Sequence, residues 1–172
     1  MKITVVGLGY VGLSNATLLA QNNTVVALDL SETRVDMVNA RKSPIDDPEL
    51  EIFLTNKTLN LTATTDPKLA YRDAEFIIVA TPTNYDPKVN YFDTTPVETV
   101  VSAVTKVNPT ATIVIKSTVP VGFIKKLRTQ YNNQNICFSP EFLREGRALY
   151  DNLYPSRIIV GARFKQAHRF AD

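Results

Sequence analysis

The chain has 172 residues, of which 44% are hydrophobic and 21% are charged. This length and composition suit one globular domain with a sizeable core, and they exclude a collagen, a disordered tail and a disulfide-knotted protein. The 19 basic and 17 acidic residues give a formal charge of +2. Because the basic residues do not cluster, the sequence argues against nucleic acid as a partner.

The cysteine content and the apolar runs bear on the compartment. A single cysteine, Cys137, cannot form an internal disulfide, which fits the reducing cytosol, so we expect a cytoplasmic protein. No uninterrupted apolar run reaches the ~18 residues that a membrane span needs. The apolar stretch after Lys2 resembles a signal peptide only loosely, because its glycines would weaken a helix. We therefore expect no membrane association.

Short β-branched runs alternate with amphipathic stretches along the chain. We expect strands at 3–6, 24–28, 61–63, 76–80, 112–115, 135–138 and 157–160, and helices at 11–21, 32–40, 96–107 and 122–131. Ser31 and the pair Asp66 and Pro67 are typical helix starts. This alternation predicts an α/β fold, with a doubly wound, mostly parallel, Rossmann-like sheet that has helices on both faces.

Two stretches rich in Pro, Asp, Asn and Thr are expected to be loops, at 43–49 and 81–95. The second follows a strand, which places it at the carboxyl edge of the sheet, where ligands bind in this architecture. At the other end of the chain, Phe164, Ala167 and Ala171 begin a helical stripe that stops without a capping signal. We therefore expect a fragment of a longer protein.

The most informative local motif is GLGYVG, which follows the first expected strand and opens a helix. Gly7 allows the tight turn, Gly9 lets the backbone approach a pyrophosphate, and Gly12 allows the helix to pack closely. Tyr10 and Val11 complete the motif at the helix N-terminus, whose N–H groups and dipole favour an anion. The pattern predicts a dinucleotide-binding site.

Asp29 ends the second expected strand, where a carboxylate can accept hydrogen bonds from a ribose diol. Its charge would repel a 2′-phosphate, so the sequence favours NAD over NADP. Arg34 leaves three interpretations open: it pairs with a phosphate, it lies along the adenosine side of the cofactor, or it is a solvated helix residue.

Two Thr-Pro turns follow strands at the same expected edge of the sheet. One is TPT, formed by Thr81, Pro82 and Thr83, and the other is STVPVG, which includes Ser117 and Thr118. Because proline fixes the backbone where each strand leaves the sheet, we expect the hydroxyls to face the cofactor crevice.

The segment SPEFLREG, at 139–146, also follows an expected strand. On a short helix, Glu141 and Glu145 would share one face, with Arg144 between them. One interpretation is a solvated helix with an ion pair. The other is a polar cluster at the nicotinamide end, where a carboxylate acting through water moves the protons that accompany hydride transfer.

Together, GLGYVG, Asp29, TPT, STVPVG, SPEFLREG and DNLYPSRIIVG resemble the N-terminal domain of the UDP-glucose/GDP-mannose dehydrogenase family, in particular its shorter bacterial UDP-glucose 6-dehydrogenases. The resemblance runs from residue 1 to about 161. It implies oxidation of UDP-glucose to UDP-glucuronate with two NAD, through an aldehyde and a cysteine thioester. GDP-mannose and UDP-N-acetylhexosamine are the alternative substrates.

The resemblance also implies roles for individual residues. The cofactor would be contacted by Val11, Asp29, Arg34, Thr83, Thr118 and Glu145. The substrate would meet Glu141, Phe142, Leu143, Arg144 and Glu145. Thr118, Glu141 and Glu145 would assist proton transfer or position water, and we predict no metal site.

The chain departs from the family in its length. In the family, the thioester-forming cysteine, the central helix that makes the dimer contacts and the nucleotide-sugar domain all follow the segment that matches here. We therefore expect residues 1–172 to be one NAD-binding domain that does not oxidise a sugar alone, within a homodimeric parent. Cys137 is interpreted as a core residue because its neighbours are apolar. A stand-alone NAD-binding module without catalysis is the alternative from a different functional class.

Overall fold

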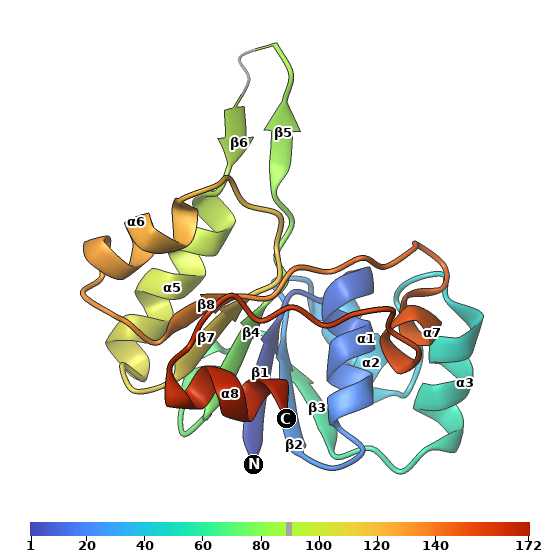
Figure 1. Cartoon of the computed structure of the whole chain (residues 1–172). Helices are drawn as coiled ribbons and strands as arrows, with labels where there is room; N and C mark the ends of the chain where they lie inside the picture. Colours follow the sequence, from blue (N-terminus) through green and yellow to red (C-terminus); the bar gives the residue numbers. More distant parts are fainter. Residues whose placement is uncertain (89–90) are drawn as a thin grey trace.

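A six-stranded parallel sheet forms the centre of the computed structural model, which describes residues 1–88 and 91–172. Its strands are β1 (Lys2–Val6), β2 (Thr24–Leu28), β3 (Leu61–Thr64), β4 (Phe76–Val79), β7 (Thr112–Ile115) and β8 (Ile136–Phe138), in the order β3-β2-β1-β4-β7-β8 (Figure 1). The order reverses between β1 and β4, which is where sheets of this type bind ligands, beyond the strands' carboxyl ends. The expected doubly wound α/β fold is confirmed.

The strands form here because both of their faces are covered. β4 and β7 are buried at every position, and β-branched and other large apolar side chains fill both faces of the sheet. A parallel sheet that is buried on both sides gives continuous apolar runs in the sequence. For that reason the sequence located these six strands within one or two residues.

Helices cover both faces of the sheet, and the sheet separates the hydrophobic core into two parts. The first core includes buried side chains of α1 (Tyr10–Leu19), α2 (Glu32–Asn39), α3 (Pro48–Asn56) and α7 (Ala148–Leu153), with α8 (Lys165–Ala171) packed against it through Phe170. The second includes side chains of α4 (Pro67–Tyr71), α5 (Thr95–Val107) and α6 (Phe123–Gln130). The expected two-sided arrangement is therefore confirmed.

Capping residues set where several of these helices begin. Ser31 accepts a hydrogen bond from the Arg34 backbone N–H, and Asp66 accepts one from Lys68, as the sequence predicts. Helix α3 was not predicted, although it begins with the same signal as α4: Asp47 accepts from the Leu50 N–H, and Pro48 follows it. The loop expected at 43–49 therefore ends where Pro48 opens a helix.

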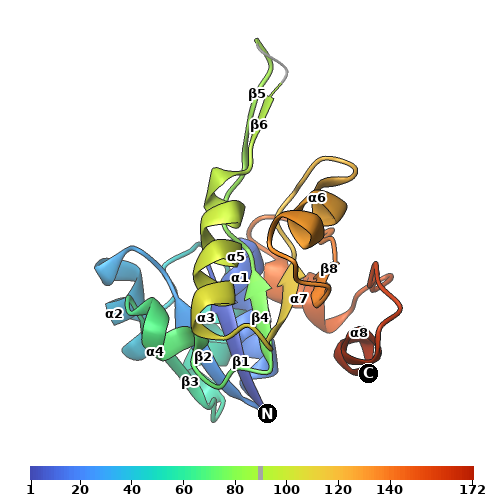
Figure 2. The same cartoon turned by 90° about the vertical axis from the view of Figure 1, so that its left-hand side faces the viewer.

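The loop expected at 81–95 contains regular structure. The strands β5 (Asn84–Asp86) and β6 (Tyr91–Asp93) pair antiparallel, and the rings of Tyr85 and Phe92 lie 4.9 Å apart between centroids. Figure 2 shows that this hairpin projects away from the body of the domain. Residues 89 and 90 of the expected loop lie outside the described part of the chain.

The strand expected at 157–160 is wrong. These residues are all described and form no strand. The following residue, Gly161, donates its backbone N–H to the carbonyl oxygen of Phe138 in β8 at 2.7 Å. Ile158 and Ile159 are exposed, so the apolar run does not mark a buried strand here. The neighbouring strand β8 has only three residues, so it offers few backbone N–H and C=O groups with which a further strand could pair.

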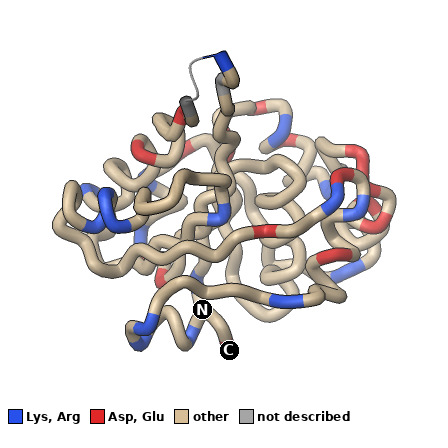
Figure 3. Tube along the Cα trace, turned by 45° about the horizontal axis from the view of Figure 1, so that its top comes forward, with Lys and Arg blue, Asp and Glu red and all other residues tan. Residues whose placement is uncertain are grey.

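Basic and acidic residues are interspersed over the domain. In the view of Figure 3, basic and acidic residues are both spread over the trace. In the residues that the structure describes, no helix is both long and apolar enough to cross a membrane.

Candidate functional site

A crevice of about 700 Å³ lies beyond the carboxyl ends of β1, β2, β4 and β7. The glycine loop, the end of β2, both Thr-Pro turns and part of SPEFLREG line it. The predicted cofactor residues that line it are Gly7, Gly9, Tyr10, Val11, Asp29, Arg34, Thr81, Pro82, Thr83, Ser117, Thr118 and Glu145. The fold thus brings together five segments that are far apart in the sequence.

The three glycines of the loop have different physical roles. Gly7 has φ +96°, and a Cβ there would lie 2.6 Å from the Ala80 carbonyl oxygen. A Cβ on Gly12 would lie 1.6 Å from the Gly7 carbonyl oxygen, so Gly12 allows the helix to pack on the turn and does not line the crevice. A Cβ on Gly9 would meet no described atom within 4 Å. The space beside Gly9 therefore suits an approaching ligand.

The N-terminus of α1 borders this space. Gly9 is its N-cap, and within the described ranges no side chain caps the helix by accepting a hydrogen bond from a backbone N–H of its first turn. The first turn, which begins with Tyr10 and Val11, also carries no acidic residue. The N-terminal N–H groups and the positive end of the helix dipole are thus left for an anion such as a pyrophosphate.

Asp29 ties the end of β2 to the glycine loop. Its Oδ2 accepts a hydrogen bond from the Leu8 N–H at 2.7 Å, and its Oδ1 accepts one from the Ser31 N–H at 2.9 Å. Arg34 Nη1 lies 3.8 Å from Asp29 Oδ2, and this arginine is half exposed. Asp29 therefore supports the shape of the loop in addition to placing a carboxylate at the crevice, a role that the sequence did not reveal.

The two Thr-Pro turns hold each other in place. Thr83 Oγ1 donates to the Thr118 carbonyl oxygen at 2.8 Å, and Ser117 Oγ donates to the Thr81 carbonyl oxygen at 2.7 Å. Thr83 and Ser117 both line the crevice, and their hydroxyls also donate to backbone across the turns. The buried Thr81 Oγ1 has no hydrogen-bond partner among the described residues.

The helix expected within SPEFLREG is wrong. All of 139–146 is described and none of it is helical, so Glu141 and Glu145 do not share a helix face. Tertiary ion pairs hold the segment instead, because Glu141 pairs with Lys116 and Arg144 binds Asp151 through two side-chain nitrogens. The Arg144 hydrogen bonds lower the pKa of Asp151 to about 2. The ion pair of Arg144 is therefore made with α7 and not with the flanking glutamates.

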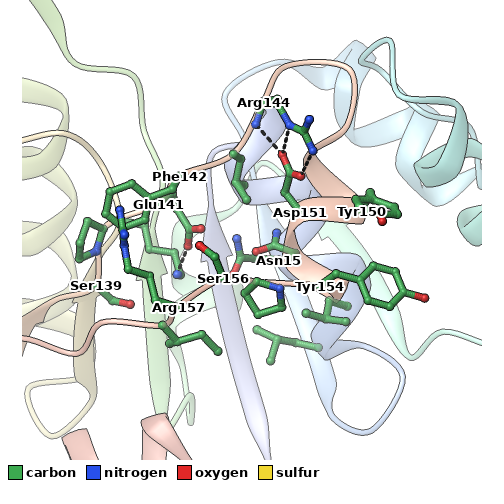
Figure 4. Close-up of a pocket in the computed structure, with 18 of the residues that line it drawn as sticks. Asn15, Ser139, Glu141, Phe142, Arg144, Tyr150, Asp151, Tyr154, Ser156 and Arg157 are labelled. Carbon is green, nitrogen blue, oxygen red and sulfur yellow. Dashed lines mark hydrogen bonds and ion pairs between the residues drawn. The ribbon is translucent and has the colours of Figure 1, made fainter.

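A second pocket of about 440 Å³ adjoins the crevice (Figure 4). Of the predicted substrate residues, Glu141, Phe142, Leu143 and Arg144 line it, whereas Glu145 lines only the crevice. Residues that the sequence analysis missed also line it, among them Asn15, Lys116, Ser139, Tyr150, Tyr154 and Arg157.

Two features of the second pocket suit a polar ligand. The Arg157 guanidinium lies 4.3 Å from the centroid of the Phe142 ring. Ser139 Oγ is buried and has no hydrogen-bond partner within 1–88 and 91–172. Buried hydroxyls in native proteins are almost always paired, so an unpaired one at a pocket wall indicates a place for a ligand or a water.

Lys116 and Glu141 line both cavities and mark the boundary between them. The sequence analysis missed Lys116, although its position directly after the apolar strand β7 was a usable signal. Burial lowers the pKa of Lys116 to about 8. The arrangement can place a dinucleotide and a second molecule side by side, with an ion pair where they meet.

Cys137 is a buried residue that does not border either cavity. It is fully buried in β8, and it lines neither the crevice nor the second pocket. Burial raises the pKa of its thiol to about 11. The interpretation of Cys137 as a core residue is therefore confirmed.

We expect the Cys137 thiol of the folded chain to react slowly with Ellman's reagent. At pH 8, a pKa near 11 leaves about 100-fold less thiolate than the ordinary value of 9.0, and burial slows access further. The rate should rise about tenfold per pH unit to about pH 11, provided that the chain stays folded. The urea-unfolded chain is the control, and equal rates in both states would contradict burial of the thiol.

Comparisons with known proteins agree with this geometry. The model of the UDP-glucose/GDP-mannose dehydrogenase family, NAD binding domain, matches residues 1–172. A UDP-glucose 6-dehydrogenase of Streptococcus pneumoniae is 52% identical over all of this chain and 45% of its own length. One from Campylobacter jejuni is 50% identical over 94% of this chain and 42% of its own length. The chain thus spans less than half the length of these relatives.

Solved structures show the same fold at lower identity. A ternary complex of GDP-mannose dehydrogenase from Pseudomonas aeruginosa and a UDP-glucose dehydrogenase from Pyrobaculum islandicum each have a TM-score of 0.86 and 29% identity to this chain. Both similarities cover 99% of this chain and less than half of the other protein. This chain belongs to the UDP-glucose/GDP-mannose dehydrogenase family and matches its NAD-binding domain.

Proposed function

We propose that the crevice binds NAD along the edge of the sheet, with the pyrophosphate beside Gly9 at the N-terminus of α1. Asp29 would accept hydrogen bonds from the adenosine ribose, and the turns at Thr83 and Thr118 would flank the nicotinamide end. The observation that carries this proposal is the open space beside Gly9, in a loop where a Cβ on Gly7 or Gly12 would collide with backbone.

We further propose that a longer protein containing this chain oxidises UDP-glucose to UDP-glucuronate. Bound NAD would accept a hydride from the sugar carbon in each of two oxidations. The second pocket would receive the sugar end of the substrate, because it meets the crevice at Lys116 and Glu141. Thr118, Glu141 and Glu145 would hold a water or the reacting hydroxyl in place and assist proton transfer.

The choice of UDP-glucose rests on the relatives. The two that are 50–52% identical to this chain are UDP-glucose 6-dehydrogenases, whereas the GDP-mannose dehydrogenase structure is 29% identical. This chain would supply the cofactor-binding residues, the residues that handle protons and the pocket for the sugar end of the substrate. Its one thiol is buried in β8 and cannot reach a substrate in either cavity, so the thioester-forming cysteine would come from elsewhere in the longer protein.

Calorimetric titration of the 172-residue chain with NAD and with NADP tests the cofactor proposal. We expect NAD to bind more tightly, because the Asp29 carboxylate repels a 2′-phosphate. Equal or tighter binding of NADP would contradict it.

The substrate proposal is tested by following NADH absorbance with UDP-glucose and with GDP-mannose. The longer protein should reduce NAD faster with UDP-glucose, and the 172-residue chain should reduce none. If the 172-residue chain produced NADH and Cys137→Ser abolished this, then Cys137 would be the nucleophile and the proposal would fail.

A further inference from the structure

The boundary between the crevice and the second pocket includes a buried ion pair. Lys116 Nζ contacts Glu141 Oε1, and the two side chains are only 8% and 12% exposed. Each of the other ion pairs found among the described residues has at least one partner that is more than 40% exposed. Among the described residues, the ion pair of Lys116 and Glu141 therefore differs from the others in that both of its side chains are largely buried.

The sheet fixes the position of Lys116. It directly follows β7, and its N–H donates to the Val79 carbonyl oxygen of β4 at 2.8 Å. Glu141 lies in a segment without regular secondary structure, which is joined to the sheet by the Ser139 N–H, a donor to the Ile115 carbonyl oxygen, and by this ion pair. The rigid partner is thus the lysine, and the glutamate is the one that is held.

The burial of the pair makes each side chain depend on the other. Removing two charges from water is unfavourable unless each stabilises the other, and losing one partner leaves an uncompensated buried charge. Burial lowers the pKa of Lys116 to about 8, and the neighbouring Cys137 opposes that shift. A carboxylate beside an amine favours the charged form of the amine, so Glu141 is suited to be the partner of Lys116.

We propose that Lys116 is a positioning residue that acts through Glu141: it holds the carboxylate in place where the cofactor crevice meets the second pocket. Glu141 then presents a fixed hydrogen-bond acceptor to a water or a substrate hydroxyl at the place where hydride transfer would occur. This role rests on the proposed function. In this role, Lys116 does not contact the reacting atoms itself.

The first test uses the 172-residue chain and needs no turnover. The ¹³Cε resonance of labelled Lys116 is followed against pH in the wild type and in Glu141→Gln. Loss of the carboxylate should lower the pKa of Lys116 further, because the charged amine loses its partner. The matched control, Glu145→Gln, removes a crevice carboxylate four residues away and should leave the titration unchanged. An identical Lys116 titration in all three proteins would overturn the proposal.

The second test measures turnover of UDP-glucose by the longer protein. Lys116→Met should lower kcat by about 100-fold, the scale expected when a reacting group is misplaced, with the NAD affinity retained. Lys116→Arg keeps the charge and should recover part of that loss. In the Glu141→Gln background, Lys116→Met should have little further effect.

The outcomes of the second test separate the proposal from its premise. An undiminished loss in the Glu141→Gln background would show that Lys116 acts directly and would overturn the proposal. Lack of turnover by the wild-type longer protein would count against the proposed function, while the ¹³C titration would still decide whether Lys116 depends on Glu141.

Discussion

Gly12→Ala is expected to destabilise the domain by more than about 3 kcal/mol, at the upper end of the cost of overpacking a core. The new Cβ would lie 1.6 Å from the Gly7 carbonyl oxygen and 2.8 Å from its carbon. Both atoms belong to the backbone, so no side-chain rotation relieves the overlap. The helix would have to move off the turn, and urea unfolding followed by circular dichroism measures the loss.

Gly9→Ala is the matched comparison in the same loop. Its Cβ would meet no described atom within 4 Å, so only the poorer N-cap of alanine should lower the midpoint of unfolding, by much less than in Gly12→Ala. NAD affinity should nevertheless fall at least about tenfold, because the methyl group occupies the space proposed for the pyrophosphate. A stable Gly12→Ala protein would contradict the packing role, and full NAD affinity in Gly9→Ala would contradict the placement of the cofactor.

Asp29→Asn is expected to reduce NAD affinity on the order of 100-fold. The neutral amide oxygen accepts more weakly than the carboxylate, and a loss of about 1.4 kcal/mol at each of two ribose hydroxyls corresponds to about 100-fold in affinity. NADP affinity should fall less, because the repulsion of its 2′-phosphate disappears as well. Calorimetric titration of both cofactors therefore measures a smaller preference for NAD.

The control for Asp29→Asn is Asp66→Asn. Asp66 also follows a strand and caps a helix by accepting from a backbone N–H, but it does not line the crevice. Its substitution should leave both cofactor affinities unchanged. The interpretation of Asp29 as a selector of NAD would be wrong if the ratio of the two affinities stayed the same in Asp29→Asn.

Local signals explain which parts of the fold were predictable. The glycine motif, the capping residues Ser31 and Asp66 and the buried strands are each determined by a few neighbouring residues, and the structure has them where the sequence predicts. Helix α3 carried the same local signal, Asp47 before Pro48, but it was hidden in a stretch whose composition is typical of loops.

The failures have a common physical cause. SPEFLREG has helical spacing, yet Glu141 is held by Lys116, 25 residues away, and Arg144 by Asp151 in α7. Such contacts depend on the folded sheet and override local propensity. Residues 157–160 are apolar enough for a strand but lack a partner strand of sufficient length. The position of Lys116 after β7 was a usable signal, but its pairing with Glu141 was not predictable, because only the tertiary fold joins the two residues.

The position of the cofactor is tested most directly by titrating the ¹⁵N-labelled 172-residue chain with NADH and following the backbone amide resonances. We expect the largest changes at Gly9, Tyr10 and Val11, where the pyrophosphate would contact the helix N-terminus, and further changes at Asp29 and Thr83. Changes confined to α8 or to the far ends of the strands, with the glycine loop unaffected, would contradict the account.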